Sequence, residues 1–234
     1  LAEQIMLLEA NNDCELRFAS HSRGRRPSRL LVTWGTLESM GIETLGDVLW
    51  LLGLVVWCVI RYAPYRRARR VATVVKRDRD RERVLLIISF LGMFALPLVF
   101  VATGEPRFAG YRPHPMQIVL GALILAAALW VFRRTHKELG RNWSATLEVR
   151  ESHTLITTGI YRSVRHPMYA GYWLWTAAQA LLIANWIAGP AGILSFALHF
   201  FMRIGREEQM LRERFGEAYL DYAARTSRII PGLY

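Results

Sequence analysis

The sequence predicts an all-α integral membrane protein with about five transmembrane helices, and two observations point to this class. The 234-residue chain is 53% hydrophobic, yet it carries a formal net charge of +11. Its apolar residues are gathered in long blocks, and its basic residues lie mostly between those blocks. This pattern favours apolar helices joined by basic loops over a soluble fold with one buried core.

Five apolar blocks define the expected helices. The first three are each about 18 residues or longer, close to the roughly 20 residues that a helix needs to cross a bilayer. The fourth and fifth are separated by Gly189-Pro190, which predicts a tight helical hairpin. A soluble bundle is the alternative, but five such blocks would leave too little polar surface to cover them. The blocks are residues 45–62, 84–102, 115–132, 169–188 and 191–202.

The loops predict the orientation in the membrane. Residues 61–83 carry ten basic and three acidic side chains, whereas the only basic residues in 103–114 are Arg107 and Arg112. Basic loops tend to stay cytoplasmic. We therefore expect the first helix to begin outside, the C-terminus to lie inside, and the excess charge to face anionic membrane lipids rather than nucleic acid.

The N-terminal segment 1–39 does not follow this pattern. It is basic on the side expected to be outside, and it lacks the apolar core of a signal peptide. Met40 directly precedes the first apolar block. We expect residues 1–39 to be a disordered extension or a mis-assigned start, whose removal leaves membrane insertion unchanged.

Cysteine and histidine usage argues against redox and metal chemistry. Cys14 and Cys58 form neither a disulfide framework nor a CxxC site. The histidines stand at unrelated spacings, so no metal site is expected. They are His21, His114, His136, His153, His166 and His199.

Charged residues at the edges of the last two blocks are candidates for chemistry. Arg165 and His166 directly precede the fourth block in the stretch SVRHPMYAGYW. Arg203 and Glu207 stand four residues apart, hence on one face of a helix that leaves the membrane. Taken singly, the first pair could be headgroup anchors and the second an ordinary helical ion pair.

In combination these motifs resemble the isoprenylcysteine carboxyl methyltransferase family, over roughly residues 140–234. The family pattern is RHPxY, a helical hairpin, RxxxEE, FGxxYxxY and a proline near the end. The matching positions are Arg165, His166, Pro167 and Tyr169, then Arg203, Glu207 and Glu208, then Phe215, Gly216, Tyr219, Tyr222 and Pro231.

The resemblance implies a membrane enzyme that uses S-adenosylmethionine, with its cofactor pocket on the cytoplasmic side. The apolar blocks predict three N-terminal transmembrane helices in residues 40–132, and the resemblance implies a catalytic region, with the hairpin and a C-terminal helix, in residues 133–234. Arg203 is expected to bind the methyl acceptor. The expected cofactor-binding residues are His153, Thr154, Leu155, Ile156, Tyr161, His166, Pro167, Met168, Tyr169 and Glu207.

The implied acceptor is the C-terminal carboxylate of an isoprenylcysteine-like lipidated molecule. A carboxylate is already ionised at neutral pH, so it needs no general base, and a guanidinium can hold it in a bidentate manner. The alternative is a phospholipid or another lipidic amine. That acceptor must lose a proton, which would make His166 or a glutamate the base.

Overall fold

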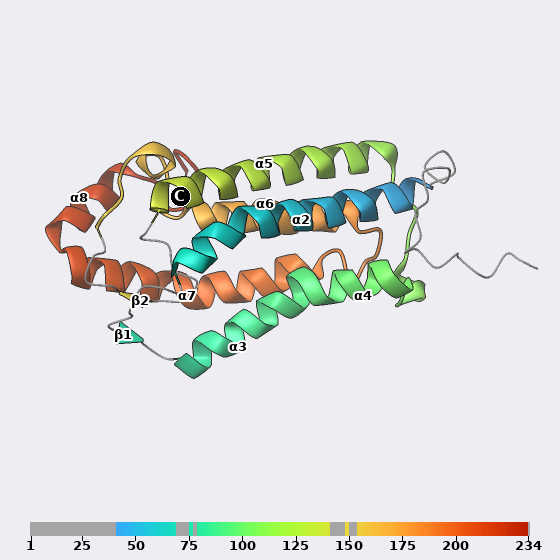
Figure 1. The fold of residues 1–234 in the computed structure, drawn as a ribbon, viewed down its shortest axis with the longest axis horizontal. Helices are drawn as coiled ribbons and strands as arrows, with labels where there is room; N and C mark the ends of the chain where they lie inside the picture. The colour runs from blue at the N-terminus through green and yellow to red at the C-terminus, as the bar shows by residue number, and fades with distance from the viewer. Residues whose placement is uncertain (1–40, 69–74, 77–78, 141–147, 150–153, 234) are drawn as a thin grey trace, which may run out of the picture.

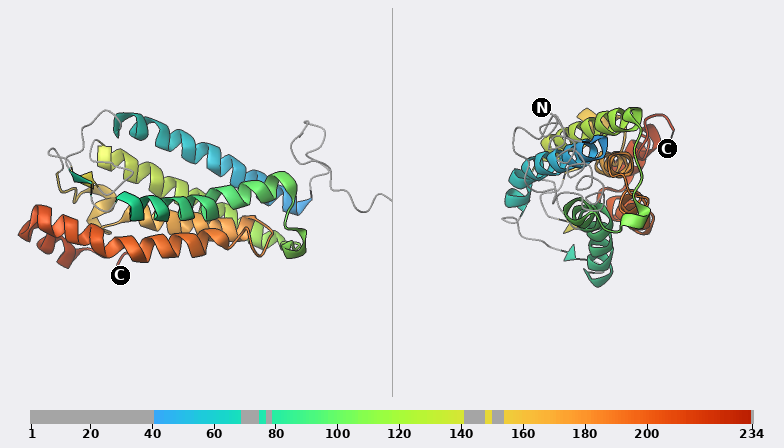
Figure 2. Two further views of the ribbon diagram at one scale, coloured as in Figure 1. Left: turned by 90° about the horizontal axis from the view of Figure 1, so that it is seen from below. Right: turned by 90° about the vertical axis from the view of Figure 1, so that its right-hand side faces the viewer.

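The structure, a computed structural model, describes residues 41–68, 75–76, 79–140, 148–149 and 154–233. Long helices run roughly along one axis and form an elongated bundle (Figure 1). Helix α5 packs along α6, α2 packs on α5, and α7 packs on α6 and α3. The two further views in Figure 2 show the same elongated arrangement from below and from one end.

The described elements are almost entirely helical. In chain order they are α2 (Ile42–Ala68), β1 (Val75–Lys76), α3 (Arg79–Phe90), a π-helical turn (Leu91–Ala95), α4 (Leu96–Thr103), a 3-10 turn (Arg107–Ala109), α5 (Pro115–Leu139), β2 (Glu148–Val149), a second 3-10 turn (Gly159–Arg162), α6 (Pro167–Leu182), α7 (Ala191–Phe215) and α8 (Glu217–Arg225). Strands β1 and β2 form one short antiparallel pair.

Three helical segments of the described chain are long and apolar enough to cross a membrane. They are Ile42–Tyr62, Asp80–Thr103 and Pro115–Leu139. The first three predicted spans are therefore confirmed by length and composition. The fourth and fifth predicted spans correspond to α6, which has only 16 residues, and to the apolar first half of α7. These two do not meet the same criterion, and their place in the membrane stays a prediction.

Large aromatic side chains fill the centre of the bundle. The ring of Trp175 on α6 lies 6.2 Å from Trp50 and from Trp57 on α2, and 5.8 Å from Phe94. Trp57 also lies 6.5 Å from Phe132 on α5. Tilted rings at these separations pack favourably, and they join four helical segments in one core.

The π-helical turn follows from a proline inside an apolar helix. Pro97 has no amide hydrogen, and in a regular α-helix its ring would clash with the carbonyl four residues earlier. The Leu96 amide donates to the carbonyl of Leu91, five residues back, which leaves the Gly92 carbonyl without a helical donor. The Gln179 side chain on α6 supplies one at 3.1 Å.

Helix α6 ends six residues before the predicted limit of the fourth apolar block. The predicted span reached Ala188, but the helix stops at Leu182, and residues 183–190 form a turn. The reason is Asn185, whose side-chain oxygen accepts the amides of Ile187 and Ala188 at 2.9 Å. Its amide group donates to the carbonyl of Pro106. The predicted reversal at Gly189-Pro190 is therefore the last part of a longer connection.

Two helices extend beyond their apolar blocks. Helix α5 continues seven residues past the predicted end at Phe132, through residues that include Arg133 and Arg134, to Leu139. Helix α7 joins the fifth apolar block and the polar stretch after it into one helix of 25 residues. It ends where Gly216 takes a positive φ of 53° before α8. The length of an apolar block therefore predicts which part of a helix can lie in the membrane, but it does not predict where the helix ends.

The three-carbonyl contact of Gln179 gives a test of this packing. Gln179→Met keeps a similar volume but removes the donor to the carbonyls of Gly92, Ala188 and Gly189. A buried polar group left unsatisfied costs about 1–3 kcal/mol, so the thermal unfolding temperature in detergent should fall clearly. Gln209→Met, at an exposed position on α7, is the matched control and should change it little. Equal unfolding temperatures for both variants contradict this role.

Candidate active site

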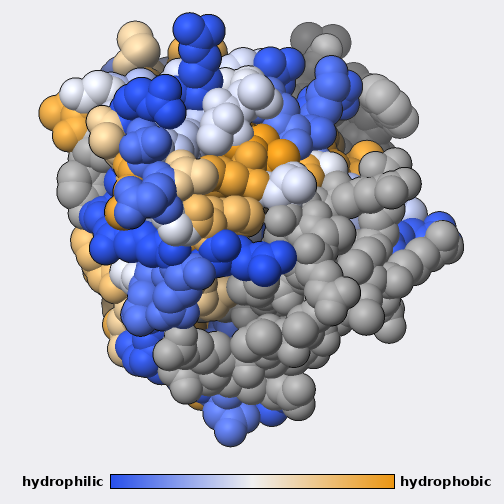
Figure 3. All heavy atoms as spheres, turned by 90° about the vertical axis from the view of Figure 1, so that its left-hand side faces the viewer, coloured by the Kyte–Doolittle hydropathy of each residue, from blue (hydrophilic) through white to orange (hydrophobic). Residues whose placement is uncertain are grey.

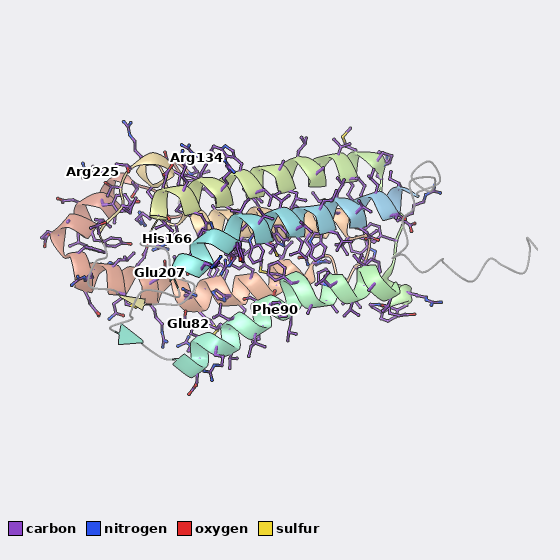
Figure 4. The ribbon with its side chains drawn as sticks, in the orientation of Figure 1. Glu82, Phe90, Arg134, His166, Glu207 and Arg225 are labelled. Carbon is purple, nitrogen blue, oxygen red and sulfur yellow. The ribbon has the colours of Figure 1, made fainter. Side chains whose placement is uncertain are left out.

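Three segments that are distant in the sequence meet at the end of the bundle where α6 begins. The strand-like stretch before α6 pairs with the C-terminal segment: the amide of Arg165 donates to the carbonyl of Ser227 at 2.8 Å, and that of His166 to Arg228 at 3.0 Å. The polar half of α7 lies beside both. Figure 4 shows His166 and Glu207 close together at this end, with Glu82 on α3 nearby.

Glu208 on α7 is the centre of a buried ion network. Its side chain is only 4% exposed, and cationic groups from the other two segments surround it. Arg228 donates to both carboxylate oxygens, at 3.0 and 2.9 Å, and Arg165 lies at 3.2 Å. His166 lies at 3.4 Å and Arg212 at 3.8 Å. The carboxylate therefore joins the start of α6 and the C-terminal segment to α7.

Glu207, the preceding residue, has a different set of neighbours. Its carboxylate accepts a hydrogen bond from the Tyr169 hydroxyl and lies 3.6 Å from Nδ1 of His166. Oε2 also lies 3.5 Å from Nε of Arg203. The side chain is 27% exposed, so unlike Glu208 it remains reachable from outside the protein.

The charges of this cluster support one another. Burial alone would raise the pKa of Glu207, but His166, Arg203 and Tyr169 outweigh it and lower the pKa to about 2. The pKa of Glu208 is likewise lowered, by His166 and Arg228 against the effect of burial. Burial would lower the pKa of His166, yet the two carboxylates on either side of its ring raise it. Both carboxylates are thus ionised at neutral pH, and the imidazolium form of His166 is favoured.

Arg203 lies where α7 changes from apolar to polar residues, and its guanidinium is held by three groups. Nη1 lies 3.0 Å from Oε1 of Glu82 on α3 and 3.5 Å from Nε2 of His199. Ser89 donates to a backbone carbonyl and lies 3.0 Å from Nδ1 of His199. This places the His199 proton on Nδ1 and leaves Nε2 as an acceptor toward Arg203. With Glu207 on Nε, the side chain is fixed and only 11% exposed.

A glycine turn lies beside this cluster and is fixed by α5. Gly159 has a positive φ of 63°, and a Cβ there would lie 1.9 Å from a carboxylate oxygen of Glu138. The same carboxylate accepts the amide of Ile160, so a larger residue at position 159 would be strained by the positive φ and would have to displace Glu138 from this contact. The turn carries the buried Tyr161, whose carbonyl accepts the Tyr222 hydroxyl at 2.7 Å. Burial is the main reason that the pKa of Tyr222 rises to about 12, which keeps this donor protonated.

The structure brings together several of the residues expected to form the site. His166, Tyr169, Arg203 and Glu207 lie in direct contact, and Pro167 and Met168 form the first turn of α6. Tyr161 is joined to α8 through Tyr222. Thr154, Leu155 and Ile156 lie in an irregular segment before the glycine turn, and their part in the site stays a prediction. His153 lies outside the described residues.

Four groups of the site were not expected from the sequence. Glu82 belongs to a charge-rich stretch that predicts an ordinary basic loop, and His199 lies inside an apolar block. Glu138 follows the third apolar block, and Arg228 lies between Tyr222 and Pro231 of the family pattern without being one of its named positions. Each acts across the fold on a distant partner, and a linear pattern does not report such pairs.

The donor set fits S-adenosylmethionine. This cofactor has a sulfonium cation, an amino-acid group, ribose hydroxyls and a flat adenine. The ionised and partly exposed carboxylate of Glu207 can accept hydrogen bonds from an amine or a hydroxyl. The hydroxyl of Tyr219 is buried without a hydrogen-bond partner, and the ring nitrogen Nε2 of His166 has only an ion-pair contact. Tyrosine faces suit a cation or an adenine.

A hollow of about 430 Å³ lies next to the network on the side of the C-terminal segment. Arg165 and Arg228, which both contact Glu208, line it, and none of the expected cofactor-binding residues is among its lining residues. They are Arg165, Ala224, Arg225, Thr226, Ser227, Arg228, Gly232 and Leu233. Among the coloured residues of the end that faces the viewer in Figure 3, hydrophilic ones lie around a hydrophobic patch.

No group of three or more histidine, cysteine, aspartate or glutamate side chains is placed to hold a metal ion in the parts of the chain that the structure describes. The charged groups of the site are instead matched with one another.

Fold and site together define a helical protein with several candidate membrane spans and a charged site at one end of its bundle. The model of the isoprenylcysteine carboxyl methyltransferase family matches residues 118–213. A rice relative, "Probable protein-S-isoprenylcysteine O-methyltransferase" (Oryza sativa subsp. japonica), is 33% identical over 134 residues, which are 57% of this chain and 67% of the relative. The chain belongs to this family.

Other relatives match a smaller share. Protein-S-isoprenylcysteine O-methyltransferase B of Arabidopsis thaliana is 30% identical over 116 residues, 49% of this chain and 55% of the relative. The human protein-S-isoprenylcysteine O-methyltransferase is 30% identical over 50% of this chain and 39% of its own length. The chain thus matches the first of these relatives over about half of that relative's length. The match to a solved structure, the eukaryotic intramembrane Ras methyltransferase ICMT, covers 88% of this chain and 70% of that chain, at 20% identity and a TM-score of 0.48.

The raised pKa of His166 predicts how stability changes with pH. The imidazolium stabilises the fold through Glu207 and Glu208, fully below the unfolded pKa of 6.5, and this contribution is lost as the pH rises through the higher folded value. His166→Gln removes the titrating group. The difference in thermal unfolding temperature between the parent protein and this variant should therefore be largest below pH 6.5 and shrink at higher pH. A difference that grows with rising pH contradicts the assignment.

Proposed function

We propose that this protein is an S-adenosylmethionine-dependent membrane methyltransferase that methylates the C-terminal carboxylate of an isoprenylcysteine-like lipidated acceptor. Membership of the family supports this reading. The single observation that carries it is the position of Arg203. Its guanidinium contacts the carboxylate of Glu207, which also accepts a hydrogen bond from Tyr169. Arg203 lies at the point where α7 changes from apolar to charged residues.

Arg203 is suited to hold the acceptor. A lipid tail lies among apolar helices while its polar head stays near the membrane surface, and Arg203 lies at that boundary of α7. A guanidinium binds a carboxylate in a planar, bidentate manner. Because the guanidinium is held by groups on α3 and α7, little side-chain entropy remains to be lost when the acceptor binds.

Glu207, His166, Tyr161 and Tyr169 are suited to hold the cofactor. When bound, S-adenosylmethionine supplies an electrophilic methyl group. Glu207 is fixed from two sides by Tyr169 and His166, so its carboxylate keeps one orientation toward a ligand. The residues of this chain orient the reactants and exclude water, which is the main demand of an in-line displacement.

The protonation of His166 favours a carboxylate over an amine as the acceptor. An amine must lose a proton, and His166 or a glutamate was the candidate base for that step. The two flanking glutamates raise the pKa of His166 against the effect of burial, which favours the protonated ring over the neutral form that a base requires. A carboxylate acceptor needs no such step. The phospholipid or lipidic-amine alternative is an outcome of the test below.

We also propose that this site faces the cytoplasm and that α6 and the first half of α7 enter the membrane as a hairpin. The basic residues at the end of α5 and the strands β1 and β2 lie at the same end of the bundle as the site (Figure 1). Basic segments favour the cytoplasmic side. A water-soluble cofactor then enters from the cytoplasm, and the lipidated acceptor from the bilayer.

A two-substrate assay tests the proposed function. The purified full chain in lipid nanodiscs is given labelled S-adenosylmethionine together with either N-acetyl-S-farnesylcysteine or phosphatidylethanolamine. We expect label in a base-labile methyl ester with the first acceptor. A base-stable product from the second acceptor alone would establish the lipid amine reaction instead.

Arg203 and Glu207 should fail in different ways although they are one helical turn apart. Glu207→Gln should weaken binding of the cofactor product, S-adenosylhomocysteine, whereas Arg203→Ala should leave that affinity nearly unchanged and lower methyl transfer. Losing a charge-assisted hydrogen bond corresponds to about 10- to 150-fold. Arg203→Lys should recover little, because an ammonium cannot form the planar fork. Calorimetric titration and turnover measure the two effects.

A purely structural ion pair gives a different pattern. Both variants would then lose thermal stability alike, and activity would fall only with the folded fraction. Equal losses of cofactor-product affinity in the two variants contradict the assignment of Arg203 to the acceptor.

A further inference from the structure

The carboxylate of Glu82 lies where an acceptor carboxylate is expected to bind. It contacts Nη1 of Arg203 at 3.0 Å, which is shorter than the 3.5 Å between Arg203 and Glu207. Both partners are buried, with 9% of the Glu82 side chain and 11% of the Arg203 side chain exposed. The strongest contact of the proposed acceptor-binding group is therefore made to a carboxylate of the protein itself.

A third carboxylate cannot join this arrangement without cost. Arg203 already lies between two anionic side chains, and like charges repel strongly where water is excluded. An acceptor that approaches Arg203 must either accept this repulsion or displace one carboxylate. Glu207 is on the same helix and is also held by Tyr169 and His166, so it is the harder of the two to displace.

Glu82 is the carboxylate that can yield. It belongs to α3, so its contact with Arg203 joins two helices and can open without disturbing α7. It also stands in the first turn of α3, where the positive end of the helix dipole stabilises an anion. A rotation away from Arg203 therefore leaves Glu82 in surroundings that still favour its charge.

We propose that Glu82 is a stand-in for the acceptor: its carboxylate pairs with Arg203 until the carboxylate of the acceptor displaces it. This inference rests on the proposed function and deepens it. Glu82 keeps Arg203 oriented and paired in the absence of substrate, and it sets how strongly an acceptor must bind. It favours acceptors that carry a full carboxylate, since an uncharged ester or amide cannot replace the ionic contact. The methylated product has lost its charge, so it no longer competes with Glu82 for Arg203.

The test is Glu82→Gln in the full chain in nanodiscs. Removal of the competing charge should lower the KM for N-acetyl-S-farnesylcysteine by about tenfold, the lower end of the value of one charge-assisted hydrogen bond. The affinity for S-adenosylhomocysteine should stay unchanged. The ester product should inhibit the variant no more than it inhibits the parent, because that ligand has no charge with which to exploit the freed guanidinium.

Asp80→Asn is the matched control. It removes the same charge from the same end of α3, but the Asp80 side chain is 95% exposed and pairs only loosely with Arg83, at 3.8 Å. Its KM should equal that of the parent. In the background of Arg203→Ala, the Glu82 substitution should no longer change the KM, because the group for which it competes is absent. An equal fall of KM in Asp80→Asn would show a general effect of surface charge and overturn the proposal.

The remaining outcomes separate this inference from the proposed function. An active parent protein with an unchanged or higher KM in Glu82→Gln, at unchanged unfolding temperature, overturns the inference alone and makes Glu82 a residue that only orients Arg203. If Glu82→Gln does not fold, Glu82→Asp replaces it, since a shorter carboxylate reaches Arg203 less well and should lower the KM by a smaller factor. A parent protein that binds S-adenosylhomocysteine but neither binds nor methylates the prenylcysteine overturns both.

Discussion

The buried carboxylate of Glu208 is the interaction on which the site depends. A single ionised group in a water-poor interior is strongly unfavourable unless it is paired and hydrogen-bonded. Here Arg165 from the start of α6 and Arg228 from the C-terminal segment satisfy it, and His166 completes the set. Removing one partner of a buried pair costs about 3–5 kcal/mol, so the three segments are held together as a unit.

The neighbouring glutamates show how one helix separates structure from function. Successive residues of an α-helix point about 100° apart, so Glu207 and Glu208 face different surroundings. The Glu208 side chain points toward Arg165 and Arg228 and is buried from solvent. Glu207 turns toward Tyr169 and Arg203 and remains partly exposed. His166 contacts both carboxylates and thereby couples the position of the exposed one to that of the closed one. The double glutamate thus supplies one anchor, Glu208, and one candidate binding group, Glu207.

Apolar runs predicted most of the fold because helix length and lipid-compatible composition are local properties. They gave the three long spans, and the charged motifs gave the residues that meet at Glu207. The ends of the helices were harder to predict from the sequence. The stop of α6 depends on Asn185 reaching Pro106, and the π-helical turn depends on Gln179 reaching Gly92. Such contacts join residues about 80 or more positions apart in the sequence, so the local pattern of residues does not predict them.

The same limit explains why Glu82 was missed, and it points to how the site is built. Its neighbours in the sequence are charged residues of a predicted loop, so the sequence pattern does not mark Glu82 as a site residue. Only the packing of α3 against α7 turns it into the partner of Arg203. The cofactor candidates are fixed by α6, α7 and the C-terminal segment, which Glu208 joins firmly. The described contacts of α3 with this part of α7 include the ion pair of Glu82 with Arg203 and the contact of Ser89 with His199. If Glu82 is displaced by a substrate as proposed, the acceptor side of the proposed site changes while the cofactor candidates keep their geometry.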